Sequence, residues 1–263
     1  MLLTVDMGNT DITLGFFDNE ELKITLHTLT DTKKTQDEYL SLFKMLFREA
    51  DISYQKVSGG IIASVVPSLT ERIKSALESV FSFTFLLVAP PIKTGLSIRI
   101  DNPLELGGDL VADAVGTKEK FGFPSIMIDL GTATKVIVID QEGSFIGGVF
   151  TPGLKVSVQA LVGSTALLPD ISLKRPKKIV GRNTSDSMNS GAIYGCAAMI
   201  RGLVDDIEKE LGYSCHRVLM GGYAYLVKDL LSSDYSFAPD TVLNGLRIIF
   251  ERNVNEGEKN HAQ

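Results

Sequence analysis

Cysteine and histidine are scarce in this chain. The 263 residues include two cysteines, Cys196 and Cys215, and three histidines. Two cysteines cannot build a disulfide framework, and their spacing does not match that of a metal site. With His27, His216 and His261 as the only histidines, a zinc site or a Ser-His-Asp triad is nearly excluded.

The chain also has no basic block and no long apolar run. Its formal net charge is −6, so we expect no general surface for nucleic acid or for anionic membranes. The apolar runs are far too short to span a bilayer, and the N-terminus enters a strand pattern without the features of a signal peptide. We therefore expect a cytoplasmic protein with no nucleic-acid and no membrane partner.

The composition that remains is ordinary for a globular protein. Apolar residues make up 44% of the chain and charged residues 22%. The length suits two domains of about 120 to 140 residues, each able to bury its own core. We predict an N-terminal domain over 1–118, a C-terminal domain over 119–253 and a polar, disordered tail over 254–263.

One local pattern occurs twice, about half a chain apart. An apolar strand runs into an aspartate and a turn containing glycine and polar side chains, and a second apolar strand follows. The two copies are Asp6-Met7-Gly8-Asn9-Thr10 and Asp129-Leu130-Gly131-Thr132-Ala133-Thr134. The glycine lets the backbone approach a ligand closely, and the turn amides and side chains can donate to phosphate oxygens. One such turn is also typical of an ordinary hairpin, but two predict a duplicated domain with a nucleotide clamped between two phosphate-binding hairpins.

Helical patterns alternate with the later strands, which indicates an α/β fold with mixed sheets. The pairs Thr35 and Glu38, and Ser68 and Glu71, each predict a capping box at the start of a helix. The longest helical pattern, 188–211, carries an apolar stripe that predicts core and dimer interface, with Cys196 as a small core residue.

Asp109 is the candidate catalytic base on chemical grounds. A hydroxyl that accepts a phosphoryl group needs a proton acceptor within hydrogen-bond reach, and the chain offers no suitable histidine. Gly107 and Gly108 leave room for a substrate beside this carboxylate. An aspartate at the start of a helix is equally typical of an N-terminal cap, so the residues alone leave both interpretations open. Asp113, one turn later, is a second candidate.

Further short motifs follow the first hairpin in order along almost the whole chain, to about Asn253. They are Ser64-Val65-Val66-Pro67, Pro103 through Gly107-Gly108-Asp109, the second hairpin, Pro152-Gly153-Leu154, Leu168-Pro169, Gly181-Arg182-Asn183-Thr184, Ser190-Gly191 and Gly221-Gly222. Together the set resembles the type III pantothenate kinase family. The resemblance implies a duplicated actin-like, ribonuclease H-like fold with an ATP cleft between its halves, and a homodimer.

The activity that the resemblance implies is transfer of the γ-phosphoryl group of ATP to pantothenate, which gives 4'-phosphopantothenate in the first step of coenzyme A biosynthesis. It implies Mg²⁺ with ATP and a monovalent cation, K⁺ or NH₄⁺. The ATP phosphates and the divalent ion would lie on Asp6, Met7, Gly8, Asn9, Thr10, Asp11, Ile12 and Thr13, with Asp6 facing the divalent ion. Thr132 would contact ATP from the second hairpin, Gly221 and Gly222 would lie against the adenosine, and Asp129 would bind the monovalent cation.

The same resemblance implies the catalytic base at Asp109 and a pantothenate site at Ile100, Gly107, Gly108, Asp109, Leu110 and Thr184. Thr184 also suits an N-terminal cap of the helix that follows it. Many family members carry arginine where this chain has Leu110, and some carry an aromatic residue where it has Ile100. Loss of the guanidinium removes a donor for the pantothenate carboxylate or a phosphate, so substrate affinity is the property most affected.

Two other functions stay open on sequence. One is a nucleotide-binding accessory or regulatory protein on the same fold, which would bind ATP without pantothenate-dependent ADP release. The other is a different small-molecule kinase of the same superfamily, which would ignore pantothenate.

Overall fold

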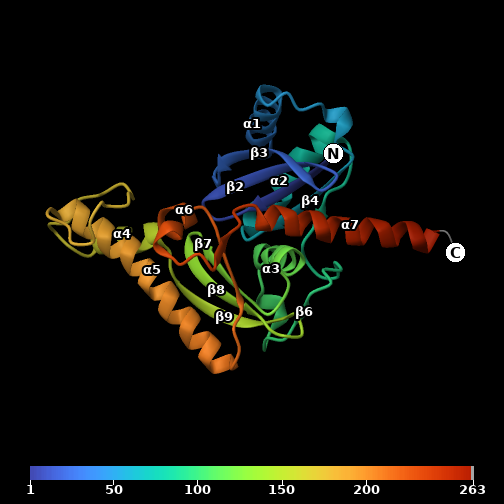
Figure 1. Cartoon of the computed structure of the whole chain (residues 1–263). Helices are drawn as coiled ribbons and strands as arrows, with labels where there is room; N and C mark the ends of the chain where they lie inside the picture. The colour runs from blue at the N-terminus through green and yellow to red at the C-terminus, as the bar shows by residue number, and fades with distance from the viewer. Residues whose placement is uncertain (262–263) are drawn as a thin grey trace. The chain divides into compact units, whose positions relative to one another are not determined.

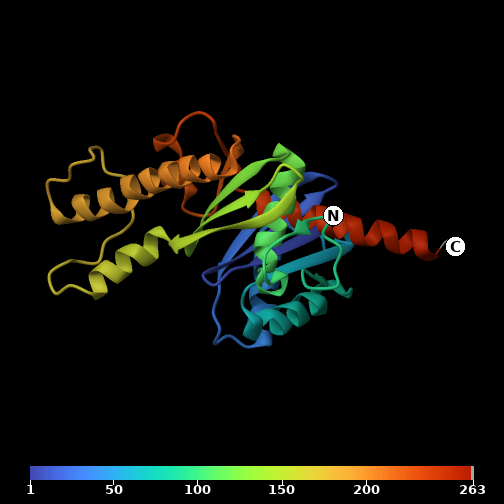
Figure 2. The same ribbon diagram turned by 90° about the horizontal axis from the view of Figure 1, so that it is seen from below.

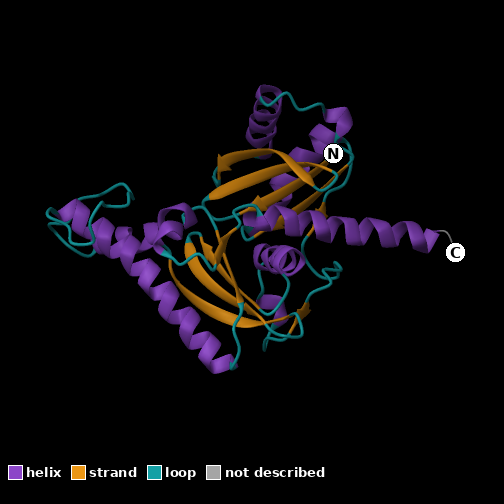
Figure 3. Ribbon diagram, in the orientation of Figure 1, coloured by secondary structure: helices purple, strands orange, loops and turns teal. Residues whose placement is uncertain are grey.

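The structure is a computed structural model, and it describes residues 1–261. The chain forms two compact units: the first comprises 1–96, 102–116 and the chain from 241, and the second comprises 97–101 and 117–240. Figure 1 labels the elements along the chain, and Figure 3 separates helices from strands. The units divide between Gly116 and Thr117, close to the predicted boundary at 118 and 119, but the last helix groups with the first unit.

A five-stranded mixed sheet forms the first unit, in the order β3-β2-β1-β4-β5. β1, β2 and β3 pair antiparallel, whereas β1, β4 and β5 run parallel. The strands are β1 (Leu2–Met7), β2 (Asp11–Asp18), β3 (Glu21–Leu29), β4 (Gly59–Ser64) and β5 (Leu86–Leu87). The helices are α1 (Gln36–Glu49), η1 (Tyr54–Lys56), α2 (Pro67–Phe81), η2 (Pro103–Glu105), most of α3 (Gly108–Phe121) and α7 (Thr241–His261).

The core of the first unit lies between its sheet and α1 and α2. Alternate residues of β1, Leu3, Val5 and Met7, are fully buried there together with Phe43 and Phe47 of α1. This alternation puts Asp6 on the other face of the sheet, because successive side chains of a strand point to opposite faces.

Helix α7 packs on that other face, where glycines replace larger side chains. A Cβ added at Gly59 would lie 2.3 Å from the Phe250 ring, and one at Gly15 would lie 2.9 Å from Leu243. Since the last helix closes this side of the first sheet, it is part of the first unit's core. It continues to His261, into the segment predicted as a disordered tail, and residues 262 and 263 lie outside the described part of the chain.

The two predicted capping boxes have different outcomes. The first is confirmed: Glu38 N donates to Thr35 Oγ1 at 3.3 Å, and Thr35 N donates to the Glu38 carboxylate at 2.7 Å. The second is wrong, since α2 begins at Pro67, after Val66, with no side-chain cap. Proline suits the first helical position because its missing N–H would have no intrahelical partner there.

The second unit repeats the strand order of the first. Its sheet runs β11-β10-β7-β8-β9-β6, so β9-β8-β7-β10-β11 corresponds to β3-β2-β1-β4-β5, and β6 is added at one edge. The strands are β6 (Ser97–Ile98), β7 (Ser125–Leu130), β8 (Ala133–Ile139), β9 (Ser144–Pro152), β10 (His216–Met220) and β11 (Tyr235–Phe237). The helices are the end of α3, α4 (Leu154–Gly163), α5 (Thr184–Leu211), α6 (Ala224–Val227) and η3 (Lys228–Leu230).

Helix α5 supplies much of the second core, as its apolar stripe predicts. Ile193, Cys196 and Ile200 pack with Ile126 and Ile128 of β7. Burial raises the pKa of the Cys196 thiol to about 11, as expected for a core residue that stays protonated. Helices α4 and α5 pack beside each other, and Figure 2 shows them side by side in yellow-green and orange. The predicted dimer interface on α5 stays a prediction.

Among the described residues, no helix combines the length and the apolar character needed to cross a membrane.

Candidate functional site

The first hairpin presents a braced polar turn. Asp6 of β1 lies opposite Thr13 of β2, and Gly8 N donates to Asp11 O at 2.9 Å across the turn. Thr30, just after β3, fixes the turn from the side: its hydroxyl donates to Gly8 O at 2.7 Å, and its amide donates to Thr10 O at 2.8 Å. The turn is therefore held by two neighbouring strands, while Asn9 and Thr10 remain exposed.

Asp109 lies at the same edge of the first sheet as this hairpin. Strands β1, β4 and β5 run parallel, so their carboxyl ends lie at a common edge, where the first hairpin follows β1. Val65 directly follows the end of β4, and Val88 directly follows the end of β5. A Cβ added at Gly107 would lie 3.2 Å from Val65 Cγ1, and one at Gly108 would lie 2.9 Å from Val88 O. The two glycines thus let the start of α3 pack against the carboxyl ends of these strands, where open α/β sheets bind ligands.

The carboxylate of Asp109 bends back over the glycine before the helix. Helix α3 begins at Gly108, so Asp109 is inside its first turn, and a Cβ at Gly107 would lie 2.5 Å from Asp109 Oδ1. Asp109 is half-buried, whereas the second candidate, Asp113, is buried, with 6% of its surface exposed. Asp109 is therefore the more accessible of the two carboxylates. Its charge interacts favourably with the helix dipole. Asp109 is not the N-terminal cap, because a cap is the residue that precedes the helix and α3 already begins at Gly108.

Leu110 and Ile100 differ in their surroundings. The Leu110 side chain is buried, with 5% exposed, so this residue is part of the packing at the start of α3. Ile100 is half-buried and belongs to the second unit, unlike Gly107 and Gly108.

The second hairpin differs from the first in the residue opposite its aspartate. Asp129 of β7 lies directly across from Lys135 of β8, and Lys135 Nζ is 3.0 Å from Asp129 Oδ2. Both side chains are largely buried, with 17% of Lys135 and 13% of Asp129 exposed. Gly131 N donates to Ala133 O at 3.1 Å across the turn, and Thr132 at its tip is exposed.

Glycines from other segments meet this hairpin. Gly153, which follows β9, donates its N–H to Thr132 O at 3.1 Å, and a Cβ there would lie 2.4 Å from Gly131 O. Gly221, which follows β10, has φ +90°, and a Cβ there would lie 2.3 Å from Asp129 Oδ1. Beside it, a Cβ at Gly222 would meet no heavy atom within 4 Å, so this backbone has room for a ligand.

Sequence reasoning gave no site role to Thr30, Gly153 or Lys135. Only Gly153 carried a signal, as a glycine directly after Pro152 at the end of a strand. Thr30 acts through hydrogen bonds to the turn between β1 and β2, and Lys135 acts through cross-strand pairing with Asp129, and a single sequence displays neither contact.

Thr184 is the first residue of α5, and the cap is its neighbour. The side chain of Asn183 accepts a hydrogen bond from Asp186 N at 2.8 Å. The alternative interpretation of Thr184 as the cap is therefore wrong, and its exposed side chain has no capping duty.

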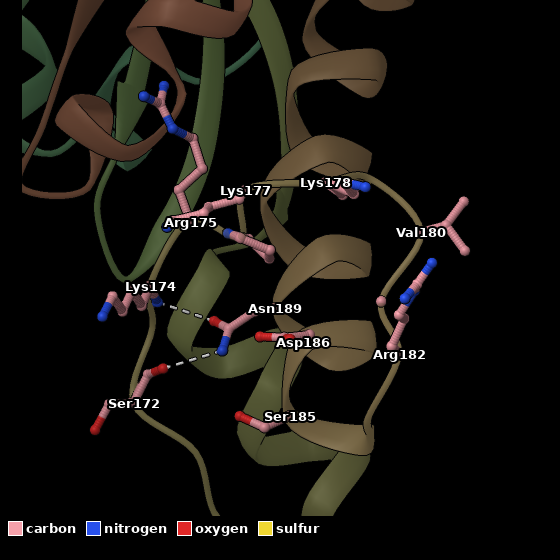
Figure 4. A pocket seen from close by; sticks show the side chains of 12 residues that line it. Ser172, Lys174, Arg175, Lys177, Lys178, Val180, Arg182, Ser185, Asp186 and Asn189 are labelled. Atoms are coloured by element: carbon pink, nitrogen blue, oxygen red, sulfur yellow. Dashed lines mark hydrogen bonds between the residues drawn. The ribbon is translucent and has the colours of Figure 1, made fainter.

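A basic pocket lies beside this end of α5 (Figure 4). Asn189 anchors its wall, accepting from Lys174 N at 2.9 Å and donating to Ser172 O at 3.2 Å. Lys174, Lys177 and Lys178, from the loop before α5, line this pocket. Its complete lining is Ser172, Lys174, Arg175, Pro176, Lys177, Lys178, Val180, Gly181, Arg182, Ser185, Asp186 and Asn189.

Comparison with known proteins identifies the family and the fold. The family model for type III pantothenate kinase matches residues 2–206. The type III pantothenate kinase of Exiguobacterium sibiricum is 37% identical over 96% of this chain and all of the relative. That of Moorella thermoacetica is 35% identical over 97% of this chain and all of the relative.

Solved structures with low sequence identity share the fold. MreB 5 of Spiroplasma citri, bound to AMPPNP, has a TM-score of 0.52 at 12% identity and covers 99% of this chain and 98% of its own. The activator of the 2-hydroxyisocaproyl-CoA dehydratase from Clostridium difficile, with bound ADPNP, has a TM-score of 0.56 at 12% identity and covers 98% of this chain and 97% of its own. With the repeated strand order, they confirm the predicted duplicated actin-like fold. The full-length sequence relatives and the family model show that the chain belongs to the type III pantothenate kinase family.

Proposed function

We propose that this chain transfers the γ-phosphoryl group of ATP to the primary hydroxyl of pantothenate, giving 4'-phosphopantothenate for coenzyme A biosynthesis. The observation that carries the proposal is the family match over nearly the whole chain. The geometry of the first unit supports it, because a braced phosphate-type hairpin and an accessible carboxylate lie at one edge of one sheet.

The first hairpin, Asp6 to Thr13, binds the ATP phosphates in this proposal. Its turn amides and the exposed side chains of Asn9 and Thr10 donate to phosphate oxygens. Among the described residues, no group of three or more histidine, cysteine, aspartate or glutamate side chains could hold a metal ion. This fits Mg²⁺, which commonly uses one or two carboxylates together with phosphate oxygens and water, so Asp6 would hold it with ATP.

Asp109 acts as the general base. Pantothenate's hydroxyl lies beside Gly107 and Gly108, gives its proton to the Asp109 carboxylate and attacks the γ-phosphorus in line with the leaving ADP. Leu110, being buried and apolar, contributes shape rather than a charge to this part of the substrate site.

The second unit supplies the other predicted contacts. Thr132 at the exposed hairpin tip contacts ATP, and the backbone at Gly221 and Gly222 lies against the adenosine, where the structure leaves room at Gly222. Thr184 and Ile100 contact pantothenate.

We also propose a cytoplasmic homodimer, with α5 at the interface, which light scattering after size exclusion would test.

The monovalent cation predicted at Asp129 does not fit this carboxylate as the structure has it. Lys135 Nζ lies 3.0 Å from Oδ2, so an ammonium group already stands at the oxygen that a potassium or ammonium ion would need.

The first prediction concerns Asp109→Asn. Measured as ADP release, turnover of the parent requires pantothenate, and the variant loses about 10²- to 10⁴-fold in kcat because the proton acceptor is gone. Binding of an ATP analogue by calorimetry stays unchanged.

The matched control is Asp37→Asn, which removes an exposed carboxylate from the first turn of α1 and leaves the site alone. An Asp109→Asn enzyme as fast as the control would exclude Asp109 as the base. ATP binding by the parent without pantothenate-dependent ADP release would favour the accessory protein instead, and ADP release with another acceptor alone would favour a different kinase.

A further inference from the structure

The ion pair between Asp129 and Lys135 is built into the second hairpin. The two residues are direct cross-strand partners, and such partners project from the same face of the sheet. That face is opposite the one covered by α5, because Leu130 and Val136, the next residue along in each strand, belong to the core that α5 joins. The ammonium is therefore held at the carboxylate by strand register, and not by a flexible surface contact.

Little space is left around this carboxylate for a second cation. Lys135 Nζ lies 3.0 Å from Oδ2. On the other oxygen, a Cβ at Gly221 would lie 2.3 Å from Oδ1, so the backbone after β10 closes that side. Since the pair is largely buried, charges here are screened less than at the surface, and another cation would be repelled by the ammonium.

The first hairpin shows that a lysine is not needed to form this structure. The same strand-turn-strand arrangement places Thr13 opposite Asp6. Thr13 carries no charge, and its hydroxyl lies 3.2 Å from His27 Nδ1. Lys135 is thus a feature of the second hairpin alone, and its charge is the property that distinguishes it.

We propose that the Lys135 ammonium takes the place of the monovalent cation at Asp129, so that this kinase works without added potassium or ammonium. The inference rests on the proposed function for its catalytic consequence. A lysine ammonium carries the same single positive charge as a potassium or ammonium ion and three N–H donors of the kind that an ammonium ion has, and it is tethered at the carboxylate. This is the opposite of the potassium dependence that the family resemblance implies.

A thermal-shift experiment tests the binding part without using catalysis. The parent, Lys135→Thr, Lys135→Gln and the control Lys209→Gln, an exposed lysine at the end of α5, are melted in potassium, ammonium and choline chloride at equal ionic strength. We expect the parent and the control to melt at the same temperature in all three salts. The melting temperature of the two Lys135 variants should be several degrees higher in potassium or ammonium chloride than in choline chloride, because a free ion fills the position that the lysine side chain no longer occupies.

A rate measurement tests the catalytic part. Pantothenate-dependent ADP release by the parent stays within twofold across the three salts, whereas that of Lys135→Thr rises at least tenfold with potassium or ammonium. A tenfold potassium response of the parent overturns the proposal, and this result needs no variant. Lys135 variants that fold but respond to no cation in melting or in rate also overturn it. If the parent releases no ADP with pantothenate in any salt, the proposed function fails, and the melting data still decide whether Lys135 replaces the ion.

Discussion

At the scale of single residues, glycine decides how closely the segments of the second unit approach Asp129. Gly221 has φ +90°, a backbone conformation that other residues avoid, and its Cα faces Asp129 Oδ1. Gly222 has neither constraint, since a Cβ there would meet nothing within 4 Å. The two adjacent glycines therefore differ in role: Gly221 lets the backbone pack against the Asp129 carboxylate, and Gly222 leaves space beside it.

The prediction at this scale is a stability difference between two alanine variants. Gly221→Ala should lower the free energy of unfolding by about 1–3 kcal/mol through backbone strain, and by more where the contact with Asp129 does not relax. Gly222→Ala should stay within about 0.5 kcal/mol of the parent. Urea denaturation measures both, and equal losses would contradict the assignment of strain to Gly221 alone.

At the scale of elements, the start of α5 separates capping from substrate binding. Asn183 caps the helix through its bond from Asp186 N at 2.8 Å, and Thr184 follows as the first helical residue. The sequence alone allowed Thr184 both to cap the helix and to bind the substrate. In the structure, Asn183 is the cap.

Two variants of α5 test this division. Asn183→Ala should cost about 0.5–2 kcal/mol of stability, as loss of a helix cap does. Thr184→Ala should keep stability within about 0.5 kcal/mol and instead raise the KM for pantothenate several-fold. Denaturation and steady-state kinetics measure the two effects. A Thr184→Ala variant as destabilised as Asn183→Ala would show that Thr184 is structural.

At the scale of the molecule, the two sheets have the same strand order, and the repeated hairpin lies at corresponding places in both. The last helix, α7, belongs to the first unit. Leu246 of α7 is fully buried, and α7 packs on the β1 and β4 side of the first unit. The chain thus returns to its first unit after completing the second.

The prediction at this scale concerns where stability is lost. Leu246→Ala should cost about 2–5 kcal/mol, as a large-to-small core change does. Hydrogen exchange should quicken in β1 and β4 of the first unit, because local stability follows the packing that is weakened. Leu219→Ala in β10, 1% exposed, is the matched change in the second unit and should act on β7 and β10. Faster exchange in β7 and β10 for Leu246→Ala would contradict the grouping of α7.

The sequence by itself determined the two strand-turn-strand segments, the first capping box, the apolar stripe of α5 and the family. These features depend on neighbouring residues or on fixed short spacings, so they can be read along the chain. Tertiary structure alone decided that Lys135 faces Asp129, that Gly153 and Gly221 close around that hairpin, and that α7 completes the first unit. Each of these depends on strand register or on packing between segments far apart in the chain, and no local pattern of residues records such contacts.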